Sequence, residues 1–373
     1  MMEKVALIRC ENYERHNVEE AVRRVFEPFG GMESIVSPGM KVLIKLNLLM
    51  KRTPDRATTT HPEVARAIAM EVQRAGGIPV FADSPGGPYT KGMLAGVYET
   101  CGIRAVAEEI GCALNDDFST TTRYYPEGKV ARQLDLIGIL DQVDAVITVG
   151  KLKTHGLTTM TGCVKNLYGV VPGTTKAEYH ARYQDVGLFS EMLIDLCGCV
   201  KPTFAVLDAV LGMEGEGPSG GSPREIGALV GGRNPHLVDE VGAKLIGIEP
   251  EQVTTLFAAK KRGLLVPYEV VGESVESMKI EDFDVPMKLK KSNLLKLIDK
   301  MPEFLRPRPV FTHRLCDGCG TCVRACPAKA IALDQNRKPT VDLSKCIRCF
   351  CCQELCPKTD VDVKRPLVFK WLK

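Results

Sequence analysis

The sequence lacks a strong net charge and long apolar runs. Its 49 Lys and Arg residues nearly balance 46 Asp and Glu residues, which leaves a formal charge of +3 at neutral pH. A nucleic-acid-binding protein usually has a pI above about 9 or a concentrated basic face, so we expect no nucleic acid as the main partner. No apolar run approaches the roughly 18–20 residues that cross a bilayer, so we expect no transmembrane segment.

The start of the chain lacks the pattern of a secretory signal. Residues 1–4 lead directly into a strand-like apolar run, Val5 to Ile8, rather than into a signal-peptide core. We therefore expect a cytoplasmic protein. The 373 residues are 45% hydrophobic and 25% charged, which excludes intrinsic disorder for most of the chain and predicts two or three domains.

Three motifs that would define a function are also missing. The sequence has no Gly-x4-Gly-Lys-Ser/Thr run and no His-Glu-x2-His pair, which excludes a P-loop and the usual zinc-protease site. The Gly-rich stretch from Gly212 to Gly221 leads to another predicted strand rather than to a helix. It therefore does not predict a Rossmann dinucleotide site.

Cysteine, in contrast, is abundant and concentrated near the C-terminus. Nine of the 15 cysteines lie between Cys316 and Cys356. A secreted disulfide framework would spread its cysteines along the chain. This concentration instead indicates thiolates that ligate metal in a reducing compartment.

The spacing of these cysteines is that of a bacterial ferredoxin. The run Cys-x2-Cys-x2-Cys-x3-Cys-Pro occurs twice, from Cys316 and from Cys346, and residues 311–360 resemble a two-cluster bacterial ferredoxin. In this pattern the fourth cysteine of each run ligates the other cluster. We therefore predict two [4Fe–4S] clusters, held by Cys316, Cys319, Cys322 and Cys356 and by Cys346, Cys349, Cys352 and Cys326.

Some alternatives stay open in this region. Cys351 falls outside the repeat and is either a buried spare thiol or a competing ligand. Zinc would also accept paired cysteines, but two unbroken runs that each end in Cys-Pro favour iron–sulfur clusters. The sequence does not separate clusters that transfer electrons from clusters that only stabilise the fold.

The first 275 residues alternate short apolar runs with helical patterns, which predicts an α/β fold with a mainly parallel open sheet flanked by helices. We divide the chain into an α/β ligand- or substrate-binding domain (1–275), a basic Pro-rich linker (276–310), the two-cluster ferredoxin domain (311–360) and a basic apolar tail (361–373). Predicted strands are Val5 to Arg9, Val42 to Leu46, Ile78 to Ala82, Ala145 to Val149, Phe204 to Leu207 and Ala228 to Val230. Predicted helices are Val18 to Phe29 with Asn17 as cap, Glu63 to Ala75, Pro235 to Gly247, and a basic helix around Asn293 to Lys300.

Charged and polar residues follow several of these strands. Ligands of open α/β sheets bind beyond the carboxyl ends of the strands, and a lysine cluster near a helix start suits an anion. We therefore predict a pocket for an anionic small molecule, with Thr158 and Thr161 capping the next helix or bonding the ligand. The predicted ligand-binding residues are Lys45, Asn47, Asp83, Lys151, Lys153, Thr158, Thr161, Lys165, Asn166 and Glu214.

Catalytic roles are assigned from position alone. His155 would move a proton, Lys153 would hold negative charge, and Asp208 would orient a ligand or metal. For His180 a functional and a structural role are equally favoured. Cys163 lies in the same loop, and a core thiol is favoured over a nucleophile there.

Three segments of the α/β region carry a resemblance to a known family. They are residues 150–155 (Gly-Lys-Leu-Lys-Thr-His), residues 165–169 (Lys-Asn-Leu-Tyr-Gly), and Asp208 with residues 212–218. Over residues 40–250 the chain resembles a domain-of-unknown-function family of anaerobic bacteria and archaea whose members often carry a two-cluster ferredoxin domain. The resemblance implies this architecture and a shared site in these loops, but no activity.

We therefore expect a ferredoxin-linked oxidoreductase in which the clusters exchange electrons with an anionic ligand and with a redox partner protein. One alternative is a non-catalytic electron-transfer or docking subunit, with the basic linker and tail as contacts. Another is a non-redox isomerase or transferase with structural clusters. The arrangement loosely resembles nickel-pincer racemases, although no aligned motif transfers their residues.

Overall fold

The computed structural model describes residues 2–285 and 306–364. The basic helix expected around Asn293 to Lys300 and the tail from Arg365 lie outside the described residues. No helix among those described is long and apolar enough to cross a bilayer.

A nine-stranded sheet forms the α/β part, with strand order β11-β1-β10-β9-β7-β2-β3-β4 and β8 paired to β7. Its central pairs β9-β7, β7-β2, β2-β3 and β3-β4 are parallel, as is β1-β11, whereas β10 runs antiparallel to both of its neighbours. The predicted mainly parallel sheet is confirmed. The strands are β1 (Glu3–Arg9), β2 (Lys41–Lys45), β3 (Ile78–Ala82), β4 (Ala113–Leu114), β7 (Ala145–His155), β8 (Thr159–Thr161), β9 (Phe204–Glu214), β10 (Ser222–Gly232) and β11 (Tyr268–Gly272).

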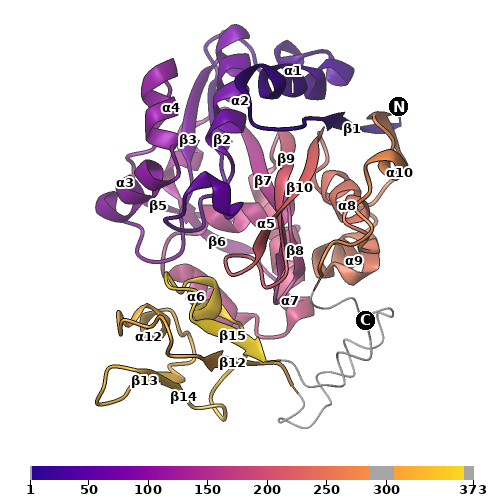
Figure 1. Cartoon of the computed structure of the whole chain (residues 1–373). Coiled ribbons are helices and arrows are strands. Elements are labelled where there is room, and N and C mark those ends of the chain that lie inside the picture. Colours follow the sequence, from indigo (N-terminus) through magenta and orange to yellow (C-terminus); the bar gives the residue numbers. More distant parts are fainter. Residues whose placement is uncertain (1, 286–305, 365–373) are drawn as a thin grey trace.

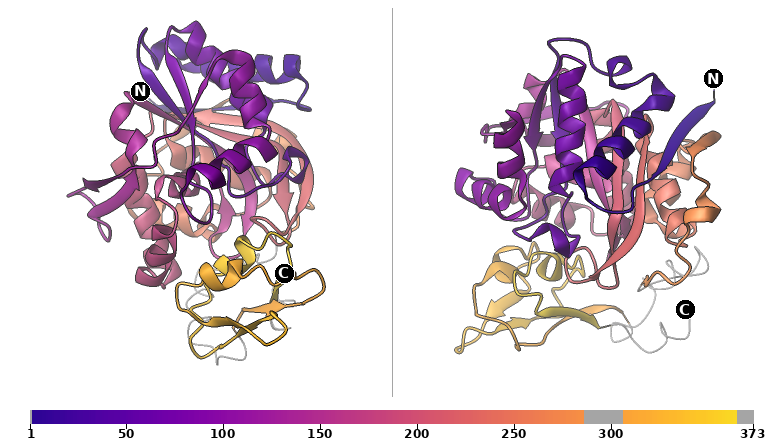
Figure 2. Two further views of the ribbon diagram at one scale, coloured as in Figure 1. Left: turned by 90° about the vertical axis from the view of Figure 1, so that its left-hand side faces the viewer. Right: turned by 45° about the horizontal axis from the view of Figure 1, so that its top comes forward.

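Helices cover both faces of the sheet (Figures 1 and 2). Neighbouring strand residues point to opposite faces, so Ile44 packs with α1–α4 while Leu43 packs in the core beside α7. The helices are α1 (Arg15–Phe26), α2 (Pro62–Arg74), α3 (Lys91–Thr100), α4 (Ile103–Ile110), α5 (Cys163–Asn166), α6 (Thr175–Arg182), α7 (Val186–Val200), α8 (Pro235–Leu245), α9 (Thr254–Lys261) and α10 (Val275–Met278), and a separate hairpin joins β5 (Thr120–Tyr124) to β6 (Gln133–Ile137).

Several predicted boundaries are wrong. Helix α1 begins at Arg15 after Glu14, so Asn17 lies inside the helix and does not cap it. Strand β7 runs on to His155, and β9 runs on to Glu214. The expected stops rested on polar residues, but these extensions pair with neighbouring strands, so their lysines are buried in the sheet.

The cysteine-rich part is a small unit with two antiparallel strand pairs of its own, of which β13–β14 is a hairpin. Strand β12 (Arg308–Phe311) pairs with β15 (Val361–Lys364), and β13 (Ile331–Leu333) pairs with β14 (Pro339–Val341). The short helices α12 (Thr321–Arg324) and α13 (Cys351–Glu354) each lie within a cysteine run. Figures 1 and 2 show this unit beneath the end of the sheet where β7 ends and β8 begins.

Candidate functional site

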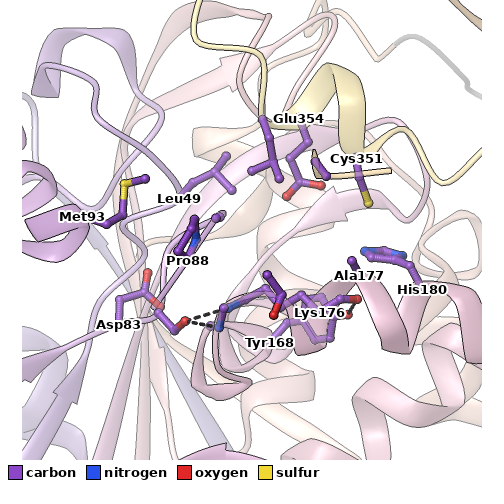
Figure 3. A pocket seen from close by; sticks show the side chains of 18 of the residues that line it. Leu49, Asp83, Pro88, Met93, Tyr168, Lys176, Ala177, His180, Cys351 and Glu354 are labelled. Atoms are coloured by element: carbon purple, nitrogen blue, oxygen red, sulfur yellow. Dashed lines mark hydrogen bonds between the residues drawn. The ribbon is translucent and has the colours of Figure 1, made fainter. Parts of the chain in front are cut away.

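A cavity of about 250 Å³ lies between the sheet and the cysteine-rich unit. Its α/β wall comes from the segments that follow β2, β3 and β8, which is the crevice where open α/β sheets bind ligands. In Figure 3, Cys351 and Glu354 lie on the side opposite Tyr168 and Lys176. The residues that the cysteine-rich unit contributes are Thr321, Arg324, Ala325, Cys351, Glu354 and Leu355.

The predicted pocket residues fall into three groups. The first group lines the cavity and comprises Asn47, Asp83, Thr161, Lys165 and Asn166. The second group lies buried outside the lining and comprises Lys45, Lys153, His155 and Thr158. The third group belongs to other contacts and comprises Lys151, Asp208 and Glu214.

Two buried pairs hold the floor of the cavity. The Lys45 ammonium lies 2.7 Å from Oδ1 of Asp83, and Oδ2 of Asp83 accepts the Leu48 N–H at 2.6 Å. Burial lowers the pKa of Lys45, and the neighbouring carboxylate opposes that shift. Beside them, Nδ2 of Asn47 donates to Oδ1 of Asn166 at 3.3 Å. These contacts fix the position of Asp83 and leave it little net charge to offer a ligand.

Lys153 is a buried lysine without an ion pair among the described residues. Its ammonium donates to Oδ1 of Asn47 at 2.9 Å and to the Thr58 carbonyl at 2.7 Å. Burial lowers the pKa of Lys153 to about 7. Lys153 therefore positions Asn47. It does not line the cavity, although it is predicted to hold the negative charge of the ligand.

We expect the free energy of unfolding to rise between about pH 7 and pH 9 because of this lysine. An unfolded lysine keeps its proton up to about pH 10.4, whereas folded Lys153 loses it near 7, so the unfolded state binds more protons in this window. Lys176, whose pKa is also lowered to about 7, adds a second such group. Lys153→Met should roughly halve the rise, measured by thermal unfolding of the full chain, and Lys201→Met should preserve it. An unchanged slope in Lys153→Met would contradict the assignment.

Lys165 is the cation at the centre of the cavity wall. Within the described part of the chain, its ammonium has neither a hydrogen bond nor an ion pair, and it lies 5.8 Å from the centre of the Tyr168 ring. After burial, its charge is the next cause that lowers the pKa of His155 and of His180, the latter to about 3. The site thus has a positive potential that centres on Lys165.

His155 faces the cysteine-rich unit. Its Nδ1 accepts the N–H groups of Leu157 and Thr158 at 3.0 and 3.4 Å, and its Nε2 lies 3.8 Å from Oε2 of Glu354. Because burial holds the pKa of His155 well below its usual value, the ring is neutral and its proton resides on Nε2. His155 therefore contacts the other unit and does not line the cavity.

The start of helix α5 is already occupied by a carboxylate. Asp239 accepts the N–H of Cys163 at 2.5 Å and that of Val164 at 3.1 Å, and burial raises its pKa to about 7. The prediction that Thr158 or Thr161 caps this helix is therefore wrong. Thr158 donates to the Met160 carbonyl, whereas the buried Thr161 hydroxyl has no hydrogen-bond partner among the described residues.

Cys163 is a core thiol, as the sequence analysis favoured. It is buried and donates to the Val206 carbonyl at 3.4 Å. Burial raises its pKa well above the usual value, which disfavours the reactive thiolate.

Lys151 and Asp208 form a separate buried network on adjacent strands. The Lys151 ammonium lies 2.9 Å from Oδ2 of Asp208 and donates to the Tyr13 hydroxyl, which donates to Oδ1 of Asp208. The His61 N–H also donates to Asp208. These groups satisfy one another and do not line the cavity, so the structure does not bring the predicted catalytic residue Asp208 to the ligand.

Glu214 also lies outside the cavity lining. It accepts the Asp284 N–H at 3.1 Å, and its Oε1 lies 3.8 Å from the Arg224 guanidinium. Glu214 therefore does not line this cavity, and its ligand-binding role stays a prediction.

The cavity wall includes Lys176 and Tyr168, to which the sequence assigned no role. Lys176 donates to Oγ of Ser84 at 3.0 Å, and its pKa is lowered to about 7 by burial. Tyr168 lines the same wall, as does His180, for which a functional role was left open, and the His180 ring stacks on Phe189 at 4.4 Å. Lys176 lies four residues before His180, and that short spacing on one helix was the only available signal.

The cysteine thiols gather in the two groups that the spacing predicts. Burial, then Cys356 and Cys319, raises the pKa of Cys322 to about 11. Burial, then Cys349, Cys346 and Cys326, raises the pKa of Cys352. Cys326 of the first run thus lies with the cysteines of the second run, and Cys356 of the second run lies with those of the first.

Cys351 stands apart from these two groups. It is buried, hydrogen-bonds with Cys349 and lines the cavity. In the described residues no three His, Cys, Asp or Glu side chains are placed to hold one metal ion. The donor set in each group, four cysteine thiols, fits a cubic [4Fe–4S] cluster.

Comparison with known proteins identifies both parts of the chain. Residues 42–244, more than half of the chain, match the family described as Domain of unknown function (DUF362). The chain belongs to this family. Residues 308–357 of this DUF362 protein match the 4Fe-4S dicluster domain. The fusion predicted from the sequence is confirmed, and the C-terminal unit is a ferredoxin-like electron-transfer domain.

Two curated proteins illustrate the two parts of this DUF362 chain. It is 35% identical over 265 residues to the thylakoid-associated protein sll1697 of Synechocystis sp., a match that covers 71% of this chain and 81% of that protein. Over 50 residues it is 42% identical to a ferredoxin of Pyrobaculum islandicum, covering 13% of this chain and 47% of the ferredoxin.

One solved structure is similar to part of the DUF362 chain. The lactate racemase apoprotein from Thermoanaerobacterium thermosaccharolyticum is 13% identical and covers 64% of this chain, with a TM-score of 0.40. The match spans 57% of that racemase chain, less than two thirds of its length.

Proposed function

We propose that this DUF362 protein is a ferredoxin-linked oxidoreductase that acts on an anionic small molecule in the cavity between its two parts. One observation supports the proposal above the others: a single cavity is lined by Lys165 on one side and by neighbours of cluster ligands on the other. Cys351 precedes Cys352, and Leu355 precedes Cys356. A ligand in this cavity therefore lies next to both predicted clusters.

The two cysteine groups have different surroundings, which favours one direction of electron transfer. Cys319 of the first thiol group is exposed, so a redox partner protein can approach that cluster from solvent. Cys349 of the second group is close enough to Tyr168 to contribute to its raised pKa, after burial and Cys351. We infer that a cluster held by the first group would accept single electrons from a partner protein, and that a cluster held by the second group would supply them to a ligand in the cavity. Unpaired thiols and iron–sulfur ligation support a reducing, cytoplasmic and anaerobic setting.

In this scheme the clusters supply single electrons, and the α/β residues bind and position the ligand. Lys165 attracts the anion, and Glu354 closes the cavity from the ferredoxin-like side. Asn166 donates both of its amide N–H groups to the Lys45 carbonyl and to Thr148, so it positions Asn47. Lys153 and the Lys45–Asp83 pair hold the amides in place. His155 lies 3.8 Å from Glu354 and outside the cavity lining, and its Nε2 has no hydrogen-bond partner among the described residues, so we assign it no contact with the ligand.

Mass spectrometry of small molecules released from the anaerobically purified protein tests this proposal. With about eight irons per chain, the number that two such clusters contain, we expect an organic anion in the wild type and none in Lys165→Met. Equal iron content would show that the substitution spares the clusters. Eight irons with no anion released from either protein would contradict the enzyme and favour the electron-transfer or docking subunit.

Arg52 should raise the reduction potential of the first cluster. Its Nη2 is buried and, among the described residues, has no hydrogen-bond partner. Burial and Arg56 lower the pKa of Arg52, whereas the Cys356 thiolate opposes them. A positive group beside an anionic cluster favours its reduced form, so Arg52→Gln should lower one of two potentials in an EPR-monitored titration of the full chain. The exposed Arg56 gives the matched control, Arg56→Gln. Equal potentials in wild type and Arg52→Gln would contradict this role.

A further inference from the structure

Among the described residues, the charges around the cavity leave one cation without a hydrogen-bond or ion-pair partner. Lys45 and Asp83 neutralise each other at 2.7 Å, and Arg324 donates to the Cys319 carbonyl and to Thr321. Lys176 donates to Ser84 and to the Val171 carbonyl. Lys165 alone among these cations makes no such contact within the described residues. The wall therefore offers one strong site for one negative charge.

An unpartnered hydroxyl lies close to this cation in the chain. Thr161 is 4% exposed and lines the cavity, and its Oγ1 finds no hydrogen-bond partner in the part of the chain that the structure describes. A buried hydroxyl without a partner costs about 1–3 kcal/mol, which a ligand oxygen would recover. Lys165 and Thr161 together suit two oxygens of one anionic group.

Phosphate sites rely heavily on backbone amides, and several amides around the cavity are already engaged. The Ser84 N–H donates to the Gly169 carbonyl, and the Gly86 N–H donates to the Leu49 carbonyl. The Gly173 N–H donates to Oγ of Ser84. Asp239 holds the first amides of α5, as described above. These amides are not available to a phosphate dianion, and the pair of Lys165 and Thr161 favours a carboxylate.

The cavity also has an apolar part. Figure 3 shows Leu49, Pro88 and Met93 on the side away from His180. Leu355 of the ferredoxin-like unit lines the cavity too. These side chains suit a hydrocarbon chain, because burying its surface is favourable by about 25 cal/mol per Å². Glu354, which also lines the cavity, would repel a second negative group on the ligand.

We propose that the ligand is a small monocarboxylic acid with a hydrocarbon chain, bound with its carboxylate on Lys165 and Thr161 and its chain against Leu49 and Met93. This inference rests on the proposed function for the location of the site, and it adds the chemical class of the ligand. A volume of about 250 Å³ limits that ligand to a small metabolite.

Calorimetry on the anaerobically purified full chain tests the class with four probes that share a six-carbon chain. They are hexanoate, neutral hexanamide, hexyl phosphate and the dicarboxylate adipate. We expect hexanoate to bind at least about tenfold more tightly than each of the others, which corresponds to about 1.4 kcal/mol. Lys165→Met should abolish this preference and Thr161→Val should weaken it several-fold, whereas Lys201→Met on an exposed surface should leave it unchanged.

Several outcomes would overturn the proposal. They are tighter binding of hexyl phosphate or adipate, no binding of hexanoate, and unchanged binding in both Lys165→Met and Thr161→Val. Cluster absorbance and the melting temperature without ligand show whether each variant folds. If Lys165→Met does not fold, Thr161→Val still tests the proposal. If hexanoate binds but no carboxylate re-oxidises the clusters, the proposed function is contradicted and the ligand class is not. Turnover of a phosphate ester would contradict the carboxylate class alone.

Discussion

Replacing Cys326 with serine should remove the cluster of the second cysteine run, although Cys326 belongs to the first run. The structure gathers Cys326 with Cys346, Cys349 and Cys352, and it gathers Cys356 with Cys319 and Cys322. Losing one thiolate ligand should therefore cost about four irons per chain, half of the total. Iron and sulfide analysis of anaerobically purified protein, with EPR of the reduced state, measures this loss.

A variant that lacks the first three cysteines shows whether the second cluster takes its fourth ligand from the first run or from its own run. In Cys316→Ser/Cys319→Ser/Cys322→Ser, we expect about four irons to remain. Adding Cys326→Ser to this variant should remove them, whereas adding Cys356→Ser should change nothing. The opposite result, with loss on adding Cys356→Ser and none on adding Cys326→Ser, would refute the exchanged arrangement.

Lys151→Met should destabilise the α/β domain by about 3–5 kcal/mol, because it leaves the Asp208 carboxylate buried without its cation. The Tyr13 hydroxyl and the His61 N–H would still donate to Asp208, but neither supplies a positive charge. Denaturant unfolding of the full chain, followed by far-UV circular dichroism, measures the loss. Anion binding in the folded variant should be retained, because Lys151 does not line the cavity.

A double variant is the matched control for this network. Lys151→Met/Asp208→Asn removes both charges, keeps a carbonyl oxygen that accepts the His61 backbone N–H, and places an amide NH2 that can donate to the Tyr13 oxygen in place of Lys151. It should therefore recover most of the stability lost in the single variant. If the double variant is as unstable as Lys151→Met, the loss arises from packing rather than from an uncompensated charge. Loss of anion binding in the folded double variant would restore the catalytic role predicted for Asp208.

The ferredoxin-like domain could be predicted from the sequence because the spacing of its cysteines identifies the cluster that they bind. Eight cysteines at fixed intervals, each run closed by Cys-Pro, require no knowledge of the fold. The parallel sheet was predictable for a similar reason, since its strands are apolar on both faces. The location of Asn47, Asp83 and Lys165 in one cavity followed from the carboxyl ends of those strands.

The failures in the α/β site also have physical causes. Lys151 and Lys153 were expected in a loop because charged residues normally end a buried strand, but β7 continues through them. Asp208 and Thr58 then supply their partners from distant segments, which no local pattern reveals. Asp239 lies 76 residues beyond Cys163 in sequence, so the occupied start of α5 could not be anticipated.

The contribution of the ferredoxin-like unit to the cavity was equally hidden. Gln353 donates to the Glu216 carbonyl at 2.9 Å, and Ser219 donates to the Glu354 carbonyl. These contacts dock the unit on the loop between β9 and β10. Only this docking brings Cys351 and Glu354 opposite Lys165.

Re-oxidation of the reduced clusters tests the central claim most directly. Anaerobic protein, reduced with dithionite and freed of excess reductant, would be mixed in a stopped-flow instrument with a panel of unsaturated and keto monocarboxylates while visible absorbance is recorded. We expect at least one carboxylate to re-oxidise the clusters of the wild type and of Lys201→Met, and none to re-oxidise those of Lys165→Met. Clusters that no carboxylate re-oxidises, while an oxidised ferredoxin accepts electrons equally from wild type and Lys165→Met, would contradict the account and identify an electron-transfer subunit.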